Sequence, residues 1–345
     1  MGDKVLEGQS RLIEEVISRG ICVKCGACVG LCPYFHYFDG KLVVMDICQA
    51  GDGRCLQVCP RVNSLDTPPE EISSEIGPLR KVFVARATDK EITKSAQYGG
   101  VVSALLIYAL DTGKINSAVL TGKNNKTSPS GRIVNESSDL LQCAGSRYSA
   151  SGTLSSLNRA IKGGEKDLAV VGLPCQMEAL SHLKNMEPDG EEMADNIGLK
   201  IGLFCTWALD YRSLRAFLKG EGVEDEILKY DIPPPPSEIF QVRTEKGWID
   251  FPLSDIRPLV QPGCELCRDM TAEQADISVG TVEGREGWNT VVVRTDLGAL
   301  LVDEAVKEGV LETEEVDQEN FNHLKQAARS KRERGKKART NRGMQ

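Results

Sequence analysis

The chain is poor in histidine. Only His36, His182 and His323 occur among 345 residues, and none stands in a metal-ligand pattern or beside a candidate nucleophile. We therefore expect ordinary surface or core roles for all three. The sequence shows no convincing acid–base pair or nucleophile elsewhere, so it does not indicate an enzyme whose own side chains carry the chemistry.

Long apolar runs are also lacking. The longest, Val101–Leu110, reaches about half the length of a membrane span, and Met1–Gly20 is charged throughout, unlike a signal peptide. We expect a cytoplasmic protein without a transmembrane segment, which a partner protein could still bring to a membrane surface. The net charge of −8 argues against general nucleic-acid binding.

What the chain does have is cysteine, with twelve residues. In a reducing compartment such residues serve as metal thiolates more often than as disulfides. Their spacing in the sequence therefore indicates the kind of metal site.

The first cysteine motif, CVKCGACVGLCP, begins at Cys22. Its spacing lets a short loop wrap a cubic iron–sulfur cluster, with Cys22, Cys25 and Cys28 on three irons, while Cys32 points toward a second cluster. Gly26 keeps this loop thin. A zinc site or a disulfide pair is the alternative, but zinc favours two separated ligand pairs over a run that ends in Cys-Pro.

The second motif, CQAGDGRCLQVCP, begins at Cys48. In a two-cluster ferredoxin the last cysteine of each motif crosses to the other cluster, so Cys59 should complete the first site. The second site then holds Cys32, Cys48 and Cys55 and lacks one cysteine. Asp52 stands where that cysteine is expected: it could ligate iron, the site could hold a three-iron cluster, or Asp52 could be a turn residue within Gly-Asp-Gly.

The remaining sequence divides into three parts. Residues 1–78 form a ferredoxin-like module that ends in a linker rich in Pro, Ser and Glu. Residues 79–324 alternate predicted strands and helices, which predicts an α/β (mixed α+β) domain with helices packed on a mostly parallel sheet. Residues 325–345 carry nine Lys and Arg against one Glu, which is typical of a solvated helix or frayed tail, or of a surface for an acidic partner.

The large domain contains five further cysteines. Cys175 and Cys205 fall at the carboxyl ends of predicted strands, the edge where α/β sheets place their ligands. Cys264 and Cys267 form a CELC pair with metal-type spacing. Together these four would hold a further four-iron cluster; otherwise they are structural cysteines and a chance CxxC. Cys143 has no assigned role.

A glycine-rich turn, Gln97–Gly100, opens a predicted helix. Glycines there let a ligand approach the backbone, and the helix N-terminus favours a phosphate or an electron-rich ring edge. Many helices begin with glycine, so the signal is weak alone. It gains support from Arg147 in AGSRY, which could pair with a phosphate. The two features suggest a nucleotide-type cofactor.

In order, the motifs SAQYGGVVSAL, AGSRY, VVGLPCQ, IGLFC, GCELCRD and ADISVGTVEGREGWNTVVVRT resemble the coenzyme F420 hydrogenase/dehydrogenase beta subunit family, which includes F420-linked formate dehydrogenase and F420-oxidising respiratory complex subunits. The resemblance covers roughly Lys81–Leu311. It implies a domain that binds FAD, exchanges hydride with coenzyme F420 and passes single electrons to two or three 4Fe–4S clusters and then to other subunits of a redox complex. Flavin is the converter needed between a hydride donor and one-electron clusters.

The resemblance also implies which residues line the flavin, and we expect no separate catalytic side chain. These residues are Ser95, Gln97, Gly99, Gly100, Lys123, Arg147 and Tyr148.

Three alternatives stay open. The hydride or electron donor could be NAD(P)H or ferredoxin in place of F420. The chain could be an electron-transfer adaptor without hydride chemistry, or a zinc-bound interaction module. The partner could be a hydrogenase, a formate dehydrogenase, a heterodisulfide reductase or a respiratory complex.

Overall fold

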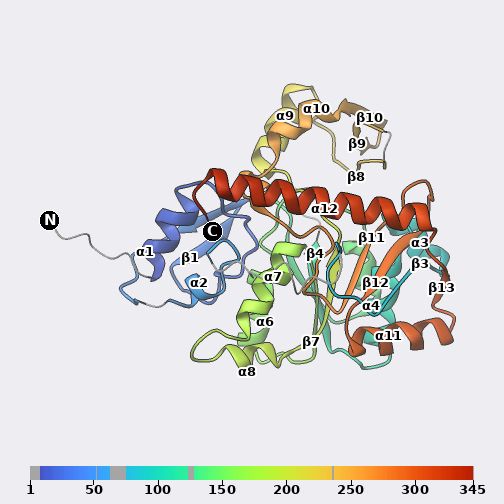
Figure 1. Ribbon diagram of the computed structural model, residues 1–345, viewed down its shortest axis with the longest axis horizontal. Coiled ribbons are helices and arrows are strands. Elements are labelled where there is room, and N and C mark those ends of the chain that lie inside the picture. The colour runs from blue at the N-terminus through green and yellow to red at the C-terminus, as the bar shows by residue number, and fades with distance from the viewer. Residues whose placement is uncertain (1–7, 52, 63–74, 123–127, 235–236, 345) are drawn as a thin grey trace.

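A mixed sheet of eight strands lies at the centre of the computed structural model, which describes residues 8–51, 53–62, 75–122, 128–234, 237–344 (Figure 1). Its strands are β3 Lys81–Ala87, β4 Ser117–Gly122, β5 Ser130–Val134, β6 Leu168–Gly172, β7 Ile197–Leu203, β11 Ile277–Thr281, β12 Asn289–Val293 and β13 Leu311–Glu314. They follow the order β13–β3–β12–β11–β7–β6–β4–β5.

Only the middle of this sheet is parallel, which corrects the prediction of a mostly parallel sheet. The neighbours β4, β6, β7 and β11 run parallel, whereas β12, β3 and β13 at one edge and β5 at the other are antiparallel to their neighbours. For β11 and β12 the cause is the short connection between Thr281 and Asn289, which carries no crossover helix and so returns the chain antiparallel.

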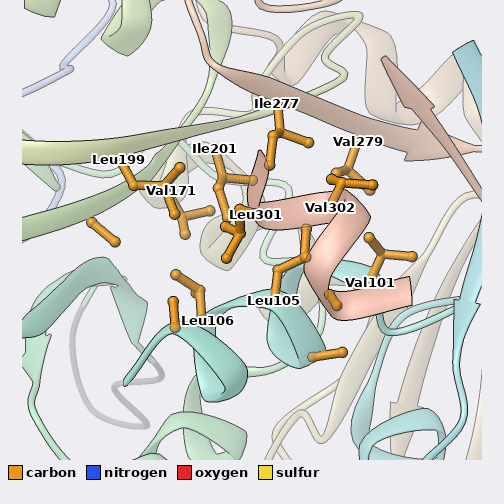
Figure 2. Packing of buried hydrophobic residues seen from close by; sticks show 14 of the residues in the cluster. Val101, Leu105, Leu106, Val171, Leu199, Ile201, Ile277, Val279, Leu301 and Val302 are labelled. Atoms are coloured by element: carbon orange, nitrogen blue, oxygen red, sulfur yellow. The ribbon is translucent and has the colours of Figure 1, made fainter. Parts of the chain in front are cut away.

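Helices cover both faces of the sheet. One face carries α3 Lys90–Ser95, α4 Val101–Asp111, α5 Ser137–Leu140, η3 Leu141–Cys143 and α11 Asp296–Lys307. Figure 2 shows the packing on this face: Leu105 and Leu106 of α4 and Leu301 of α11 lie against Val171 and Ile201 of the strands. This is the apolar core that holds the ends of the strands in place.

The opposite face carries α6 Leu154–Lys162, α7 Pro174–Leu183 and α8 Gly190–Ala194, together with the first cysteine loop. Val23, Cys25 and Leu31 of that loop are buried in the same cluster as Leu157 and Met177. The N-terminal module therefore shares a core with the large domain, and the boundary expected at residue 78 does not divide two separate cores.

The N-terminal module consists of short elements around its own small core. They are α1 Gly8–Leu12, η1 Ile13–Ile17, β1 Phe35–Phe38, β2 Lys41–Val44 and α2 Arg54–Gln57, and β1 pairs with β2 in an antiparallel hairpin. Leu12, Val16 and Phe35 are buried between them with Leu266 of the large domain. Most of the expected linker lies outside the described residues, but Ile76 is fully buried against Val292.

A smaller antiparallel sheet projects from the large domain at the top of Figure 1. It has the strand order β10–β9–β8 and packs on helices around Phe240 and Leu214. The elements are α9 Tyr211–Gly220, β8 Lys229–Asp231, β9 Ile239–Thr244, β10 Gly247–Pro252, α10 Leu253–Ile256 and η4 Arg257–Leu259. The chain then enters the short helix η5 Pro262–Leu266, which contains Cys264, the first cysteine of the CELC motif.

The basic C-terminal segment is part of one long helix, α12 Gln318–Asn341. Figure 1 shows α12 running along the molecule to the N-terminal module. Phe321 and Ala328 pack beside Val292, and Ala338 packs on the core of the module. The boundary expected at residue 324 falls inside this helix, and the segment is not a frayed tail: Lys331 and Arg339 are buried.

Among the described residues, no helix is long and apolar enough to cross a membrane.

Candidate metal centres and cofactor site

The first cysteine group comprises Cys22, Cys25, Cys28 and Cys59. All four line one cavity that encloses about 450 Å³ of empty space, its opening to solvent included. Tyr37 also lines this cavity. The N–H of Lys24 lies 3.4 Å from the Cys22 sulfur, a contact suited to a thiolate that carries negative charge. The structure brings the four predicted ligands to one cavity, and their binding of a cluster stays a prediction.

The loop that carries these thiols is fixed to the large domain. The amide of Asn158 on α6 donates to the carbonyls of Ala27 and Val29 at 2.7 and 2.8 Å. Gly26 has a φ of +85°, and a Cβ there would lie 2.5 Å from the carbonyl oxygen of Gly152. Glycine is thus required because the two backbones meet at this point, in addition to keeping the loop thin.

Burial sets the proton affinity of the first group. It raises the pKa of the Cys25 thiol to about 12 and that of Cys59 to about 11. Burial and the neighbouring thiolates also raise the pKa of Cys28, and burial raises that of Cys22. Thiols whose pKa values are raised in this way become thiolates only when a strong positive charge binds between them, as iron would supply.

The second cysteine group comprises Cys32, Cys48 and Cys55. Cys32 and Cys55 are buried in the same cluster. Burial raises the pKa of Cys55 to about 12, and the charges of Cys32 and Cys48 add to the effect. Cys55 in turn raises the pKa of Cys28, which makes the second group a neighbour of the first. Asp52 lies outside the described residues, so its role as a ligand stays a prediction.

The third cysteine group comprises Cys175, Cys205, Cys264 and Cys267. Cys175 follows β6 at the start of α7 and Cys205 follows β7, so both lie at the carboxyl edge of adjacent parallel strands. Burial raises the pKa of Cys175 well above its usual value, and the other three thiols of the group all contribute. The N–H of Ala208 lies 3.4 Å from the Cys264 sulfur.

Two buried cations stand beside these thiols, and no sequence motif predicted either. Arg61 pairs with Glu178 at 3.4 Å. Burial disfavours its charge, but Glu178 and the thiolates of Cys267, Cys175 and Cys59 raise the pKa of Arg61 above its usual value. Its Nε has no hydrogen-bond partner among the described residues. The one feature of the sequence that could have indicated Arg61 is its position two residues after Cys59, a predicted cluster ligand.

The second cation is Lys331 of α12. Its side chain is buried, and its ammonium donates to the carbonyl oxygen of Cys205.

Within the described part of the chain, no three His, Cys, Asp or Glu side chains are arranged to hold one metal ion. Each thiolate of a four-iron cluster binds its own iron, so its sulfurs stand farther apart than the ligands of one zinc ion.

The glycine turn lies between the large sheet and the small one. A Cβ on Gly99 would lie 2.8 Å from Oδ1 of Asn289, and Gly100 has a φ of +76°. Both glycines are therefore needed for packing of the turn itself. Ser95 is exposed at the end of α3, and Lys123 lies outside the described residues.

A polar network joins this turn to the small sheet through Asp231. Gln97 donates to Asp231 at 2.8 Å, Tyr98 at 3.0 Å and Tyr148 at 3.4 Å. Gln97 also accepts from the N–H of Ser146. The structure thus brings together Gln97 and Tyr148, as expected for one site, and adds Tyr98 and Asp231, which no sequence motif marked.

Arg147 lies beside this network, and one of its guanidinium nitrogens, Nε, makes no hydrogen bond to the described residues. It donates to the carbonyls of Cys143 and Ala144 at 3.3 and 3.0 Å. This Nε is buried, and burial lowers the pKa of Arg147. A buried guanidinium with a spare donor fits an anionic group such as a phosphate of a dinucleotide. Cys143, at the end of η3, is buried in the core on the face of the large sheet that carries α4.

Comparison with known proteins agrees with the sequence motifs. Residues 82–158 match the family model for the N-terminal part of the coenzyme F420 hydrogenase/dehydrogenase beta subunit, and residues 165–319 match the model for its C-terminal part. The fold and matches define a mixed-sheet α/β protein of the F420-linked redox class. The chain belongs to the coenzyme F420 hydrogenase/dehydrogenase beta subunit family.

Individual relatives span several F420-linked proteins. The chain is 34% identical over 247 residues to the coenzyme F420 hydrogenase subunit beta of Methanothermobacter thermautotrophicus, a match that covers 70% of this chain and 87% of that protein. It is 33% identical over 328 residues to the coenzyme F420-dependent sulfite reductase of Methanocaldococcus jannaschii, covering 91% of this chain. The chain spans only half, 50%, of that reductase.

A solved structure supports the fold. A chain of the F420-reducing [NiFe] hydrogenase complex from Methanosarcina barkeri matches with a TM-score of 0.72 and 30% sequence identity. The match covers 78% of this chain and 94% of that one.

Proposed function

We propose that this protein is a cytoplasmic iron–sulfur flavoprotein subunit. It exchanges hydride between coenzyme F420 and bound FAD, and it passes single electrons through 4Fe–4S clusters to or from a partner enzyme. The partner is a hydrogenase, a formate dehydrogenase, a heterodisulfide reductase or a respiratory complex. FAD would supply the conversion between two-electron hydride chemistry and one-electron transfer.

The observation that carries this proposal is the continuity of the three cysteine groups. Cys175 of the third group packs against the same buried cluster as Cys25 of the first, and Cys28 of the first packs against the cluster that contains Cys32 and Cys55 of the second. The groups therefore form a series from the carboxyl edge of the large sheet to the N-terminal module. A series of redox centres is useful when the two reactants lie on different polypeptides.

The side chains have separate tasks in this proposal. The thiols of the first and third groups would hold one four-iron cluster each, and Cys32, Cys48 and Cys55 would hold the second, either with Asp52 as a fourth ligand or as a three-iron cluster. Gln97, the Gly99–Gly100 turn, Tyr148 and Ser95, with Lys123, would line the flavin. Arg147 would neutralise a phosphate of FAD through its unpaired Nε.

The test is anaerobic purification followed by extraction and counting of cofactors. We expect non-covalent FAD and more than one cluster, that is, more than about four iron atoms per chain with matching sulfide. The purified protein is then mixed with reduced F420, NADH, NADPH or reduced ferredoxin, and flavin bleaching is followed. Bleaching by reduced F420 alone supports the proposal.

Other outcomes select the alternatives. Bleaching by a nicotinamide or by ferredoxin, but not by F420, identifies an adaptor with a different donor. Iron and sulfide without flavin identify a pure electron carrier. Zinc in place of iron would contradict the whole proposal.

A further inference from the structure

Helix α12 brings a buried positive charge to the third cysteine group. The side chain of Lys331 is only 3% exposed, although it lies in the most basic segment of the chain. Its ammonium donates to the carbonyl of Cys205 and interacts electrostatically with the sulfurs of Cys267, Cys205 and Cys264 and with the carboxylate of Asp269. A lysine is almost never buried this far without anionic partners, and three of the four anionic partners here are proposed cluster ligands.

The backbone of α12 is held close to the same group. Gly335, one turn beyond Lys331, lies so near the loop that a Cβ there would be 2.6 Å from the carbonyl oxygen of Cys267. Arg332 pairs with Glu273, and Arg342 pairs with Glu265 at 3.2 Å. These contacts along the helix hold the backbone that carries Lys331, and the hydrogen bond to the Cys205 carbonyl places its ammonium.

We propose that Lys331 sets the reduction potential of the cluster in the third cysteine group, an inference that rests on the proposed function. A fixed positive charge at a thiolate ligand stabilises the more negative, reduced form of a cluster, and its effect is strong because the site is buried. A cluster held by these four thiols would supply one-electron transfer, in which no bond is made or broken. Lys331 is a positioning charge and not a catalytic residue.

The test compares two substitutions with a matched control in the holoprotein. Lys331→Gln keeps a polar donor for the Cys205 carbonyl without the charge, and Lys331→Met removes both. Lys337→Met removes a charge from an exposed position on the same helix. The midpoint potential of the third cluster is measured by redox titration followed by electron paramagnetic resonance, and its signal is identified as the one lost in Cys264→Ala.

In both Lys331 variants we expect the ratio of oxidised to reduced cluster at a given potential to rise by about tenfold or more. This corresponds to a midpoint potential about 59 mV lower for a one-electron couple. Lys337→Met should leave it unchanged. An unchanged potential in Lys331→Gln, or an equal shift in Lys337→Met, overturns the proposal. Loss of the third cluster's iron from both Lys331 variants also overturns it, because Lys331 would then be structural. If the unaltered protein lacks a third cluster signal, the proposed function itself has failed.

Discussion

Cys175 at the start of α7 packs against the same buried cluster that contains Cys25 of the N-terminal module. Cys25 belongs to the first cysteine group and Cys175 to the third, so this pair is the point where the two groups meet. Arg61 interacts with Cys175 and Cys59 as well, and so lies beside both groups. The positive charge there would help to keep two negatively charged clusters close together.

Replacing Cys264 by Ala should remove the third cluster alone. We expect a loss of about four iron atoms per chain, while the N-terminal module keeps its own iron. Iron and sulfide analysis of anaerobically purified protein measures this. Cys143→Ala is the matched control because Cys143 is a buried cysteine in the apolar core. Equal iron loss in the two variants would show that Cys264 acts through folding and not as a ligand.

Much of the large domain could be predicted from sequence because its strands and turns are strongly patterned. The alternation of strands and helices predicted for residues 79–324 is seen, for example, in β3 at KVFVARA, in β7 at IGLKIGL and in the helix α7 that ends at Leu183. The Gly-Leu-Pro turn after β6 also places Cys175 at the sheet edge, as expected. Local apolar periodicity decides these elements, so the sequence alone suffices.

The parts that could not be predicted depend on distant partners. Tyr230 and Asp231 lie in a three-residue strand with no apolar pattern, and their role appears only when Gln97 packs beside them. Lys331 looks solvated in the sequence because its neighbours are basic, whereas the Cys205 carbonyl that it contacts is more than a hundred residues away. Charge patterns report local exposure, and tertiary contacts override them here.

Gly26→Ala should destabilise the first cysteine loop. A methyl group there would meet the Gly152 carbonyl at 2.5 Å in a backbone with positive φ. Strain of about 1–2 kcal/mol and overpacking of about 1–3 kcal/mol together predict a loss of about 3 kcal/mol. Urea unfolding under anaerobic conditions measures the change, together with the iron content.

Gly20→Ala is the control for this prediction. Gly20 also has a positive φ, +68°, but no described atom would lie within 4 Å of a Cβ at this position. The variant should therefore lose only the backbone strain of about 1–2 kcal/mol and keep all its iron. Similar losses in both variants would mean that the close approach of Gly26 to Gly152 does not matter.

The stability of the protein should fall as the pH rises toward neutrality because of Glu273. Burial and the nearby charge of Asp269 raise the pKa of Glu273 from 4.5 to about 7, despite Arg332 and Arg294. Between these values the folded state holds a proton that the unfolded state releases. The free energy of unfolding therefore falls with rising pH, by at most about 1.4 kcal/mol per pH unit, and this contribution is lost above about pH 7.

Urea unfolding at several pH values between about 5 and 8 measures this slope. Glu273→Gln should flatten it. Glu265→Gln, which alters an exposed carboxylate paired with Arg342, should leave the slope unchanged. If the free energy of unfolding still falls steeply with rising pH in Glu273→Gln, the pH dependence comes from other groups.

The last prediction concerns the direction of electron flow. The N-terminal module shares its core with the large domain, so removing residues 1–78 would expose Leu157 and Met177, and a point substitution is the better test. Cys55→Ala should disable only the second group, at the end of the series. Reduced F420 should then still bleach the flavin, and an artificial dye that reaches the flavin should still be reduced, while electron delivery to the partner enzyme is lost.

The number of electrons taken up from reduced F420 distinguishes the steps. Cys55→Ala should still fill the first and third groups, because Cys25 and Cys175 remain packed in the same cluster. Cys264→Ala should leave electrons on the flavin alone, because the group nearest the sheet edge is then broken. If Cys55→Ala keeps its FAD but no longer accepts hydride, the module belongs to the hydride site, and the proposed series of electron transfers is wrong.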